Sequence, residues 1–131
     1  MPHLSAKIAQ YAIIQNDQGK ILVLERKRSK IWSLPGGRLE KSDRNPLAAL
    51  RREVKEELNL LVTGAEPMDV SIIQDKYQIK YCVYFLVDIK DLTSLKLSGE
   101  HSDFKWVDKK NVKGMRFEDK IIVKIIDSLL D

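Results

Sequence analysis

Gly36-Gly37-Arg38-Leu39-Glu40 opens the stretch that decides the fold, which continues through Asn45-Pro46 to Arg52-Glu53-Val54-Lys55-Glu56-Glu57-Leu58-Asn59-Leu60. Asparagine is a good helix N-cap, and proline suits the first helical position, where a missing N–H costs nothing. Leucine or valine recurs at three- and four-residue steps at 47, 50, 54 and 58, which gives one apolar stripe. The stretch therefore predicts a sharp glycine turn followed by a helix that packs on a core.

Three carboxylates share another face of this helix. Glu53, Glu56 and Glu57 lie at i, i+3 and i+4, where like charges repel by roughly 0.2–0.5 kcal/mol per pair. Convergent carboxylates suit a hard cation such as Mg²⁺ or Mn²⁺, and Arg52 is spaced to hold the carboxylate of Glu56. A solvated acidic face with nearby basic counter-charges is the alternative that the helix alone leaves open.

The glycine turn and the acidic helix together resemble the Nudix box. Its pattern is Gly, five residues, Glu, seven residues, then Arg-Glu-apolar-any-Glu-Glu-any-Gly-apolar. The run from Arg52 to Leu60 matches the second half at every position but one, and Trp32-Ser33-Leu34-Pro35-Gly36-Gly37 with Glu40 resembles the family's usual approach to the box. A motif of this length is specific.

The chain departs from the family pattern in three ways. Asp43 stands where the first box Glu is expected, and Ser42 where a Gly commonly precedes it. The span from Asp43 to Arg52 is longer by an insertion around Arg44-Asn45. Asn59 replaces the closing Gly, a mild change because Asn tolerates the left-handed conformation at a helix end.

The resemblance covers nearly the whole chain and implies a single Nudix hydrolase domain over residues 1–131. The implied fold is an α/β (α+β) protein, an α/β/α sandwich with a mixed β-sheet. The implied reaction is Mg²⁺-dependent cleavage of a nucleoside diphosphate linked to another group, with Mn²⁺ as a second cofactor to test. A nucleoside triphosphate, oxidised ones included, is the first expected substrate. The alternatives are a dinucleoside polyphosphate hydrolase, a non-catalytic nucleotide-binding module, and a charged structural helix in a domain of unknown role.

The resemblance also assigns roles to residues. It implies that Glu53, Glu56, Glu57 and the backbone carbonyl of Gly37 bind the metal, and that Arg52 orients the carboxylates. Asp43 contributes through its charge or through water. The general base in the family is either a box Glu or a Glu from a later loop. Glu100, in Ser98-Gly99-Glu100-His101, is the candidate here for the base or for a further ligand.

Substrate recognition rests on weaker signals. Arg38, Trp32, Tyr77 and Tyr81 are candidate substrate-binding residues, although large aromatic side chains are usually part of a core. Tyr77 lies at about the position where some dinucleoside polyphosphate hydrolases carry a Tyr. For His101, a solvated or loop-bonding side chain is favoured over a phosphate contact, because a lone His is weak support for a site.

Composition places the chain among ordinary globular proteins. Its 131 residues are 44% hydrophobic and 32% charged, and no apolar run approaches the roughly 20 residues of a membrane span. A single Cys82, expected to be buried, and the lack of a signal-peptide pattern predict a cytoplasmic protein.

The net charge of +4 favours phosphate ligands only weakly. We expect a nucleotide as substrate and neither a stable nucleic-acid partner nor a membrane, with a homodimer possible. The short basic cluster Lys27-Arg28-Ser29-Lys30 is interpreted as a solvated loop.

Strand patterns fill most of the remaining chain. Residues 7–14 and 20–26 are predicted to pair as an antiparallel hairpin across Asn16-Asp17-Gln18-Gly19. Short strands follow at 31–34, 38–40, 60–65 and 70–74, with Glu66-Pro67 expected to separate the last two. Residues 77–89 are predicted as an inner strand, 99–103 as a polar loop and 104–107 as the last strand. A helix over 117–130 closes the chain.

Overall fold

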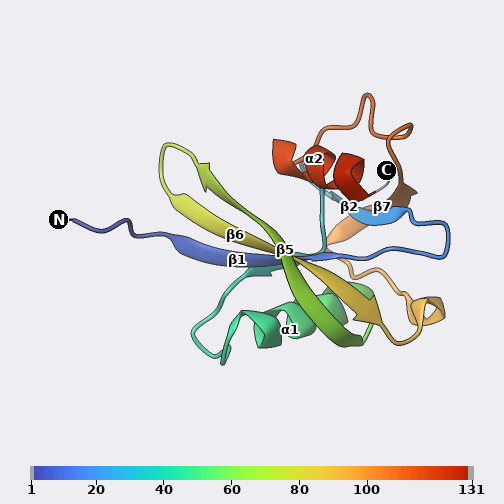
Figure 1. Cartoon of the computed structure of the whole chain (residues 1–131), viewed down its shortest axis with the longest axis horizontal. Helices are drawn as coiled ribbons and strands as arrows, with labels where there is room; N and C mark the ends of the chain where they lie inside the picture. Colours follow the sequence, from blue (N-terminus) through green and yellow to red (C-terminus); the bar gives the residue numbers. More distant parts are fainter. Residues whose placement is uncertain (1, 130–131) are drawn as a thin grey trace.

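A four-stranded mixed sheet lies between two helices, as Figure 1 shows for the computed structural model, which describes residues 2–129. Its strands lie in the order β4 (Gly36–Arg38), β1 (Lys7–Ile13), β6 (Ile79–Ile89) and β5 (Val62–Gln74). β1 runs parallel to β6, whereas the β1–β4 and β5–β6 pairs are antiparallel. A second, antiparallel sheet contains β3 (Trp32–Ser33), β2 (Ile21–Arg26) and β7 (His101–Val107). The predicted α/β/α arrangement with a mixed sheet is confirmed.

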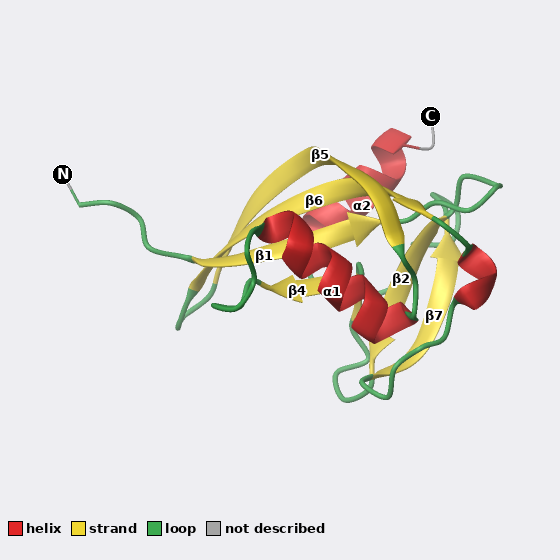
Figure 2. Ribbon diagram, turned by 90° about the horizontal axis from the view of Figure 1, so that it is seen from below, coloured by secondary structure: helices red, strands yellow, loops and turns green. Residues whose placement is uncertain are grey.

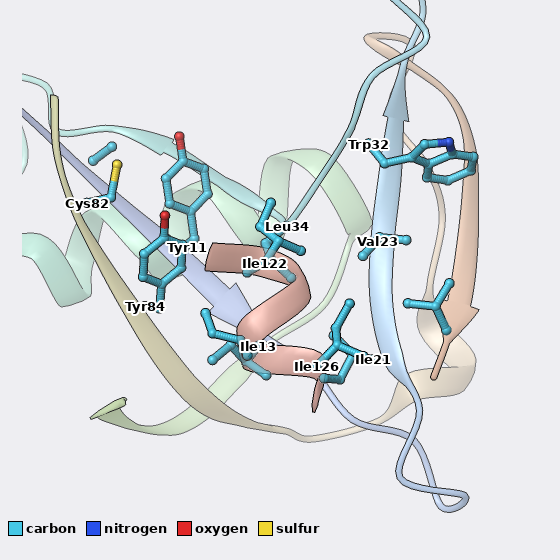
Figure 3. Close-up of a cluster of buried hydrophobic side chains, with 13 residues drawn as sticks. Tyr11, Ile13, Ile21, Val23, Trp32, Leu34, Cys82, Tyr84, Ile122 and Ile126 are labelled. Carbon is cyan, nitrogen blue, oxygen red and sulfur yellow. The ribbon is translucent and has the colours of Figure 1, made fainter. Parts of the chain in front are cut away.

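Two apolar cores lie on opposite faces of the mixed sheet. Successive strand side chains point to opposite faces, so Ile13 belongs to the cluster under helix α2 (Lys120–Leu129), whereas Ala12 belongs to the cluster under helix α1 (Pro46–Leu58). Figure 3 shows the α2-side cluster, in which Ile122 and Ile126 of the helix lie over strand side chains. Burial on both faces explains why β1 reads as an almost continuous apolar run.

Helix α1 forms as its sequence predicts. The Asn45 side chain accepts a hydrogen bond from the Ala48 N–H at 2.9 Å, and Pro46 occupies the first helical position. The helix ends at Asn59, which adopts the left-handed conformation with φ 56° and ψ 35°. Leu50, Val54 and Leu58 are fully buried. The buried stripe fixes the rotation of the helix against β1 and β4, beside which it lies in Figure 2, and turns Glu53 and Glu57 toward the glycines of β4.

The predicted hairpin of the first two strands is wrong. β1 is paired on both sides, by β4 and β6, so it has no free edge to offer β2. The turn itself forms, because Asn16 Oδ1 accepts from the N–H groups of Gln18 and Lys20, each at 3.0 Å. The pairing ends after a single antiparallel bridge between Gln15 and Ile21, and β2 continues into the second sheet.

Three other predicted boundaries are corrected. Glu66-Pro67 does not separate two strands: β5 runs without interruption through it, with register irregularities, because proline is tolerated on an edge strand. β7 begins at His101, within the predicted loop. Helix α2 begins at Lys120 and not at Phe117, which instead forms a bridge with Trp32. The predicted end of this helix at residue 130 lies outside the described residues.

Two expectations from composition can also be compared with the structure. Cys82 is fully buried, as predicted for a small apolar residue. Among the helices of residues 2–129, none has the length and apolar character needed to cross a membrane.

Candidate active site

A cleft of about 700 Å³ collects residues from four separate parts of the chain. Strand β4 contributes Gly36 and Gly37, and helix α1 contributes Glu53 and Glu57. The start of β7 and the two residues before it contribute His101, Gly99 and Glu100. The end of β2 contributes Arg26, and the turn that follows contributes Lys27, Arg28 and Ser29. The fold therefore brings the glycine pair, two of the helix carboxylates and Glu100 into one cavity.

Glu57 is the most enclosed acidic group in the cleft, with 7% of its surface exposed. Its Oε1 accepts a hydrogen bond from the Gly36 N–H at 2.8 Å, and its Oε2 lies 3.5 Å from His101 Nε2. Burial raises the pKa of Glu57 to about 8, and the charges of Glu53 and Glu100 act in the same direction. Burial also lowers the pKa of His101. Without a cation, both side chains are therefore mostly neutral near pH 7.

The Glu53 carboxylate lies against Gly37. A Cβ on Gly37 would lie 2.9 Å from Glu53 Oε1, so a side chain at this position would require the carboxylate to shift. Burial raises the pKa of Glu53, an effect opposed by the neighbouring Arg52 guanidinium. A metal ion beside this partly buried carboxylate would further stabilise its ionised form, in addition to Arg52.

Arg52 is the centre of an ionic network at the edge of the cleft. Its guanidinium donates two hydrogen bonds to Asp43, at 3.0 and 2.9 Å, one to Glu53 at 3.1 Å and one to Glu56 at 3.4 Å. The bonds from Arg52 hold the pKa of the Asp43 carboxyl below its usual range. Asp43, at the position where the resemblance expects a Glu, thus orients the arginine that contacts Glu53.

Two expected metal ligands are placed less favourably than Glu53 and Glu57. The Glu56 side chain is 61% exposed, pairs with Arg52, and is not among the residues that line the cleft. The Gly37 carbonyl accepts a hydrogen bond from Gln10 Nε2 at 2.6 Å. Gln10 is fully buried on β1, and sequence reasoning missed it because nothing in its local sequence links it to the glycine pair.

The donor set fits a cation that keeps part of its water shell. Among the described residues, no three His, Cys, Asp or Glu side chains are close enough together to hold a metal ion by themselves. Mg²⁺ usually binds through one or two carboxylates, retains several waters and takes further oxygens from phosphates. Glu53 and Glu57 supply two carboxylates, and the missing Cβ at Gly37 leaves space for the carboxylate of Glu53.

A second cavity of about 470 Å³ adjoins the first and shares Arg26 and Gly37 with it. Lys80 lies in it, mostly buried, and donates hydrogen bonds to the Tyr11 hydroxyl at 3.0 Å and to Glu118 Oε1 at 3.3 Å. Glu118 Oε1 also accepts from Arg26 Nη2 at 3.0 Å. Tyr11, Lys80 and Glu118 come from β1, β6 and the segment before α2, so no local motif could have grouped them.

The predicted substrate-binding residues separate into two groups. Arg38 lines the second cavity. Trp32 is 6% exposed and belongs to the α2-side core, as Figure 3 shows, with Lys105 Nζ 5.3 Å from its ring centroid. Tyr77 is 87% exposed, Tyr81 is also exposed, and neither lines either cavity. Of the four residues, the structure therefore brings Arg38 alone to a cavity.

His101 and the basic cluster also differ from expectation. His101 is not solvated: it is buried, and it lies on the wall of the cleft next to Glu57. The residues of the basic cluster are exposed in a turn, as predicted, but Lys27, Arg28 and Ser29 line the same cleft as the carboxylates.

Comparison with known proteins agrees with the resemblance of the sequence to the Nudix box. A family model described as the NUDIX domain matches residues 6–125. Two proteins of Saccharomyces cerevisiae, an m7GpppN-mRNA hydrolase and an mRNA-decapping enzyme subunit 2, are each 27% identical over 122 residues. The match covers 91% of this chain and 12% of each relative, so the chain spans about an eighth of their length.

Solved structures share the fold over nearly the full chain. A MutT NUDIX hydrolase from Burkholderia pseudomallei superposes with a TM-score of 0.80 at 20% identity, covering 95% of this chain and 99% of that one. A MutT protein from Methanosarcina mazei gives 0.75 at 24% identity, with coverages of 97% and 96%. An Ap4A hydrolase from C. elegans gives 0.75 at 20% identity, with coverages of 92% and 93%.

Proposed function

The chain belongs to the NUDIX domain family, whose hydrolases act on pyrophosphate bonds of nucleotide derivatives, and on this premise we propose that it is a divalent-cation-dependent nucleoside triphosphate pyrophosphohydrolase. One observation carries the proposal. Glu53 and Glu57, one turn apart on α1, line the same cleft as the glycine pair, and Gly36 bonds directly to Glu57. Mg²⁺ is the expected cation, with Mn²⁺ as the second to test.

Glu53 and Glu57 are the groups that would hold the cation. A bound divalent cation neutralises phosphate charge and lowers the pKa of a nearby water. Glu57 must first lose its proton, and the Gly36 N–H then keeps one oxygen of the carboxylate fixed. Arg52 holds Glu53 in place from the other side. Glu56 and the Gly37 carbonyl stay predicted ligands whose contribution a substitution or a metal-bound structure must test.

Glu100 is the proposed general base. It lines the cleft from the residue group before β7, separate in sequence from the helix carboxylates. In this role its carboxylate accepts the proton of the water that attacks phosphorus. His101, next to it, contacts Glu57 and helps to enclose that carboxylate.

The nucleoside is proposed to occupy the second cavity. This cavity adjoins the acidic cleft through Arg26 and Gly37, so one molecule can extend from one cavity into the other. Arg38, Lys80 and Glu118 offer hydrogen-bonding groups there, and Tyr11 adds an aromatic side chain. These residues replace Trp32, Tyr77 and Tyr81 as the proposed recognition group.

The test is a substrate panel measured with and without Mg²⁺. It contains nucleoside triphosphates, oxidised ones included, dinucleoside polyphosphates and capped RNA, the last two because of the Ap4A hydrolase and the yeast relatives. We expect pyrophosphate release from triphosphates that stops on chelation and falls at least about 100-fold in Glu57→Gln and Glu53→Gln. Lys113→Ala, in an exposed loop that lines neither cavity, is the control.

Other outcomes are equally informative. Faster cleavage of a dinucleoside polyphosphate or of capped RNA would replace the proposed substrate class. Nucleotide binding without release of any product would favour the non-catalytic module. Wild-type rates in both Gln variants would reject the metal site.

A further inference from the structure

The turn between β2 and β3 carries cations that the proposed hydrolysis has not used. Lys27, Arg28 and Ser29 line the acidic cleft. Neither Lys27 nor Arg28 has an ion-pair or hydrogen-bond partner for its side chain within residues 2–129, although Glu53, Glu57 and Glu100 line the same cavity. Unpaired cations and a carboxylate group that takes a metal ion therefore share one cleft.

Hydrogen bonds define the shape of this turn. The Arg26 N–H donates to the Ile31 carbonyl and the Lys30 N–H donates to the Arg26 carbonyl, each at 3.0 Å. Lys30 adopts the left-handed conformation with φ 59°, which reverses the chain. The Arg26 side chain is tied to Glu118 at 3.0 Å. A closed turn of this kind loses less conformational entropy on binding a ligand than a free loop would.

The combination of charges selects a type of ligand. A group that meets a divalent cation at Glu53 and Glu57 and also meets Lys27 and Arg28 must carry negative charge along its length. A polyphosphate chain does so, because every further phosphate adds charge and hydrogen-bond acceptors. A nucleoside diphosphate sugar continues beyond its two phosphates with a neutral group, which gains nothing from two cations.

We propose that the turn 26–30 is a binding site for the terminal phosphates of the substrate, and that it selects chains of three or more phosphates over nucleoside diphosphate sugars. This inference rests on the proposed function, because it places the pyrophosphate linkage at Glu53 and Glu57. The nucleoside lies in the second cavity, the cleaved linkage at the carboxylates and the end of the phosphate chain at Lys27 and Arg28.

The test compares Lys27→Ala/Arg28→Ala with Lys110→Ala/Lys113→Ala. Both double variants remove two positive charges from exposed loops, but the second pair lines neither cavity. For the first, we expect the KM for a nucleoside triphosphate to rise about tenfold with kcat within about twofold of wild type. The KM for a nucleoside diphosphate sugar should change less than about twofold. Inhibition by inorganic tripolyphosphate should weaken about tenfold, because the end of its chain occupies the turn.

Several results would overturn the inference. Equal changes for triphosphate and diphosphate-sugar substrates, no change for either, or equal effects of the two double variants would each do so. Loss of binding to a single-stranded RNA oligonucleotide with unchanged triphosphate kinetics would assign the turn to nucleic acid instead. Calorimetric titration with tripolyphosphate needs no turnover, so it tests the turn even if the proposed hydrolysis fails. Circular dichroism melting checks that each variant is folded.

Discussion

Replacing Glu57 with Gln should make the metal-free protein more stable at alkaline pH, although it removes a proposed metal ligand. Glu57 is buried, and its pKa is raised to about 8. At pH values between the ordinary pKa of a Glu and about 8, Glu57 keeps a proton in the folded protein that it has lost in the unfolded chain. The resulting stabilisation is present at low pH and is lost as the pH rises through about 8. Glutamine is neutral at every pH and can still accept from the Gly36 N–H.

The size of the effect follows from the pKa shift. The pKa rises from the model-compound value of 4.5 to about 8, and each unit corresponds to about 1.4 kcal/mol. Integration between pH 6 and pH 9 gives a loss of about 2–3 kcal/mol in the unfolding free energy that comes from Glu57. This is a sizeable part of the 5–15 kcal/mol typical of a small domain.

Urea denaturation at several pH values between 6 and 9, with EDTA present, measures this loss. The unfolding free energy of wild type should fall relative to Glu57→Gln by about 2–3 kcal/mol across the range. Glu56→Gln, on the exposed part of the same helical turn, should keep the wild-type pH dependence. Parallel curves for wild type and Glu57→Gln would refute the reasoning, because they would mean that Glu57 is ionised throughout.

Three further predictions concern the glycine pair, the arginine network and the metal. Gly36→Ala should strongly destabilise the protein, since φ is 143° and the new Cβ would clash with the Gln10 carbonyl oxygen; a thermal melt like that of wild type would contradict this. Asp43→Ala should weaken Mn²⁺ binding about tenfold or more, because Arg52 loses its partner with two hydrogen bonds; electron paramagnetic resonance measures free Mn²⁺, and Asp43→Glu should restore the affinity. Mn²⁺ affinity of wild type should increase as the pH approaches about 8, since the cation displaces the proton of Glu57; calorimetry in buffers of different ionisation enthalpy should detect the released proton, and an affinity independent of pH would argue against Glu57 as a ligand.

Features encoded by neighbouring residues could be predicted from the sequence. The N-cap, the first-turn proline and the left-handed end of α1 depend on a few consecutive residues, and all three form as expected. The apolar stripe of the helix fixed which face would be buried, and Leu50, Val54 and Leu58 are buried. Local patterns of this kind are independent of the rest of the chain.

Features that depend on strand order could not be predicted in the same way. The turn at Asn16 to Gly19 was correct, but the partner of β1 was not, because β4 and β6 occupy both of its edges. Gln10, Tyr11 and Lys80 reach the site region through those pairings. Their sequence neighbours are ordinary strand residues and give no sign of a cavity. The cytoplasmic location and the possible homodimer stay predictions.

The altered loop before α1 bears on whether the protein is a hydrolase or a module that has lost turnover. An aspartate at position 43 has a shorter side chain than the glutamate of the family pattern, and the loop that follows is longer. The Asp43 N–H donates to the Glu40 carbonyl at 3.0 Å, and the Glu40 N–H donates to Asp43 Oδ2 at 2.8 Å, which closes a turn beside α1.

This turn holds Asp43 where both of its oxygens accept from Arg52, and Arg52 in turn contacts Glu53 at 3.1 Å. The contact from the loop to the arginine to a cleft carboxylate is therefore intact despite the change of residue type. A metal site depends on support of this kind for its carboxylates. The departure from the motif therefore leaves Glu53 with the positioning that the proposed metal site needs.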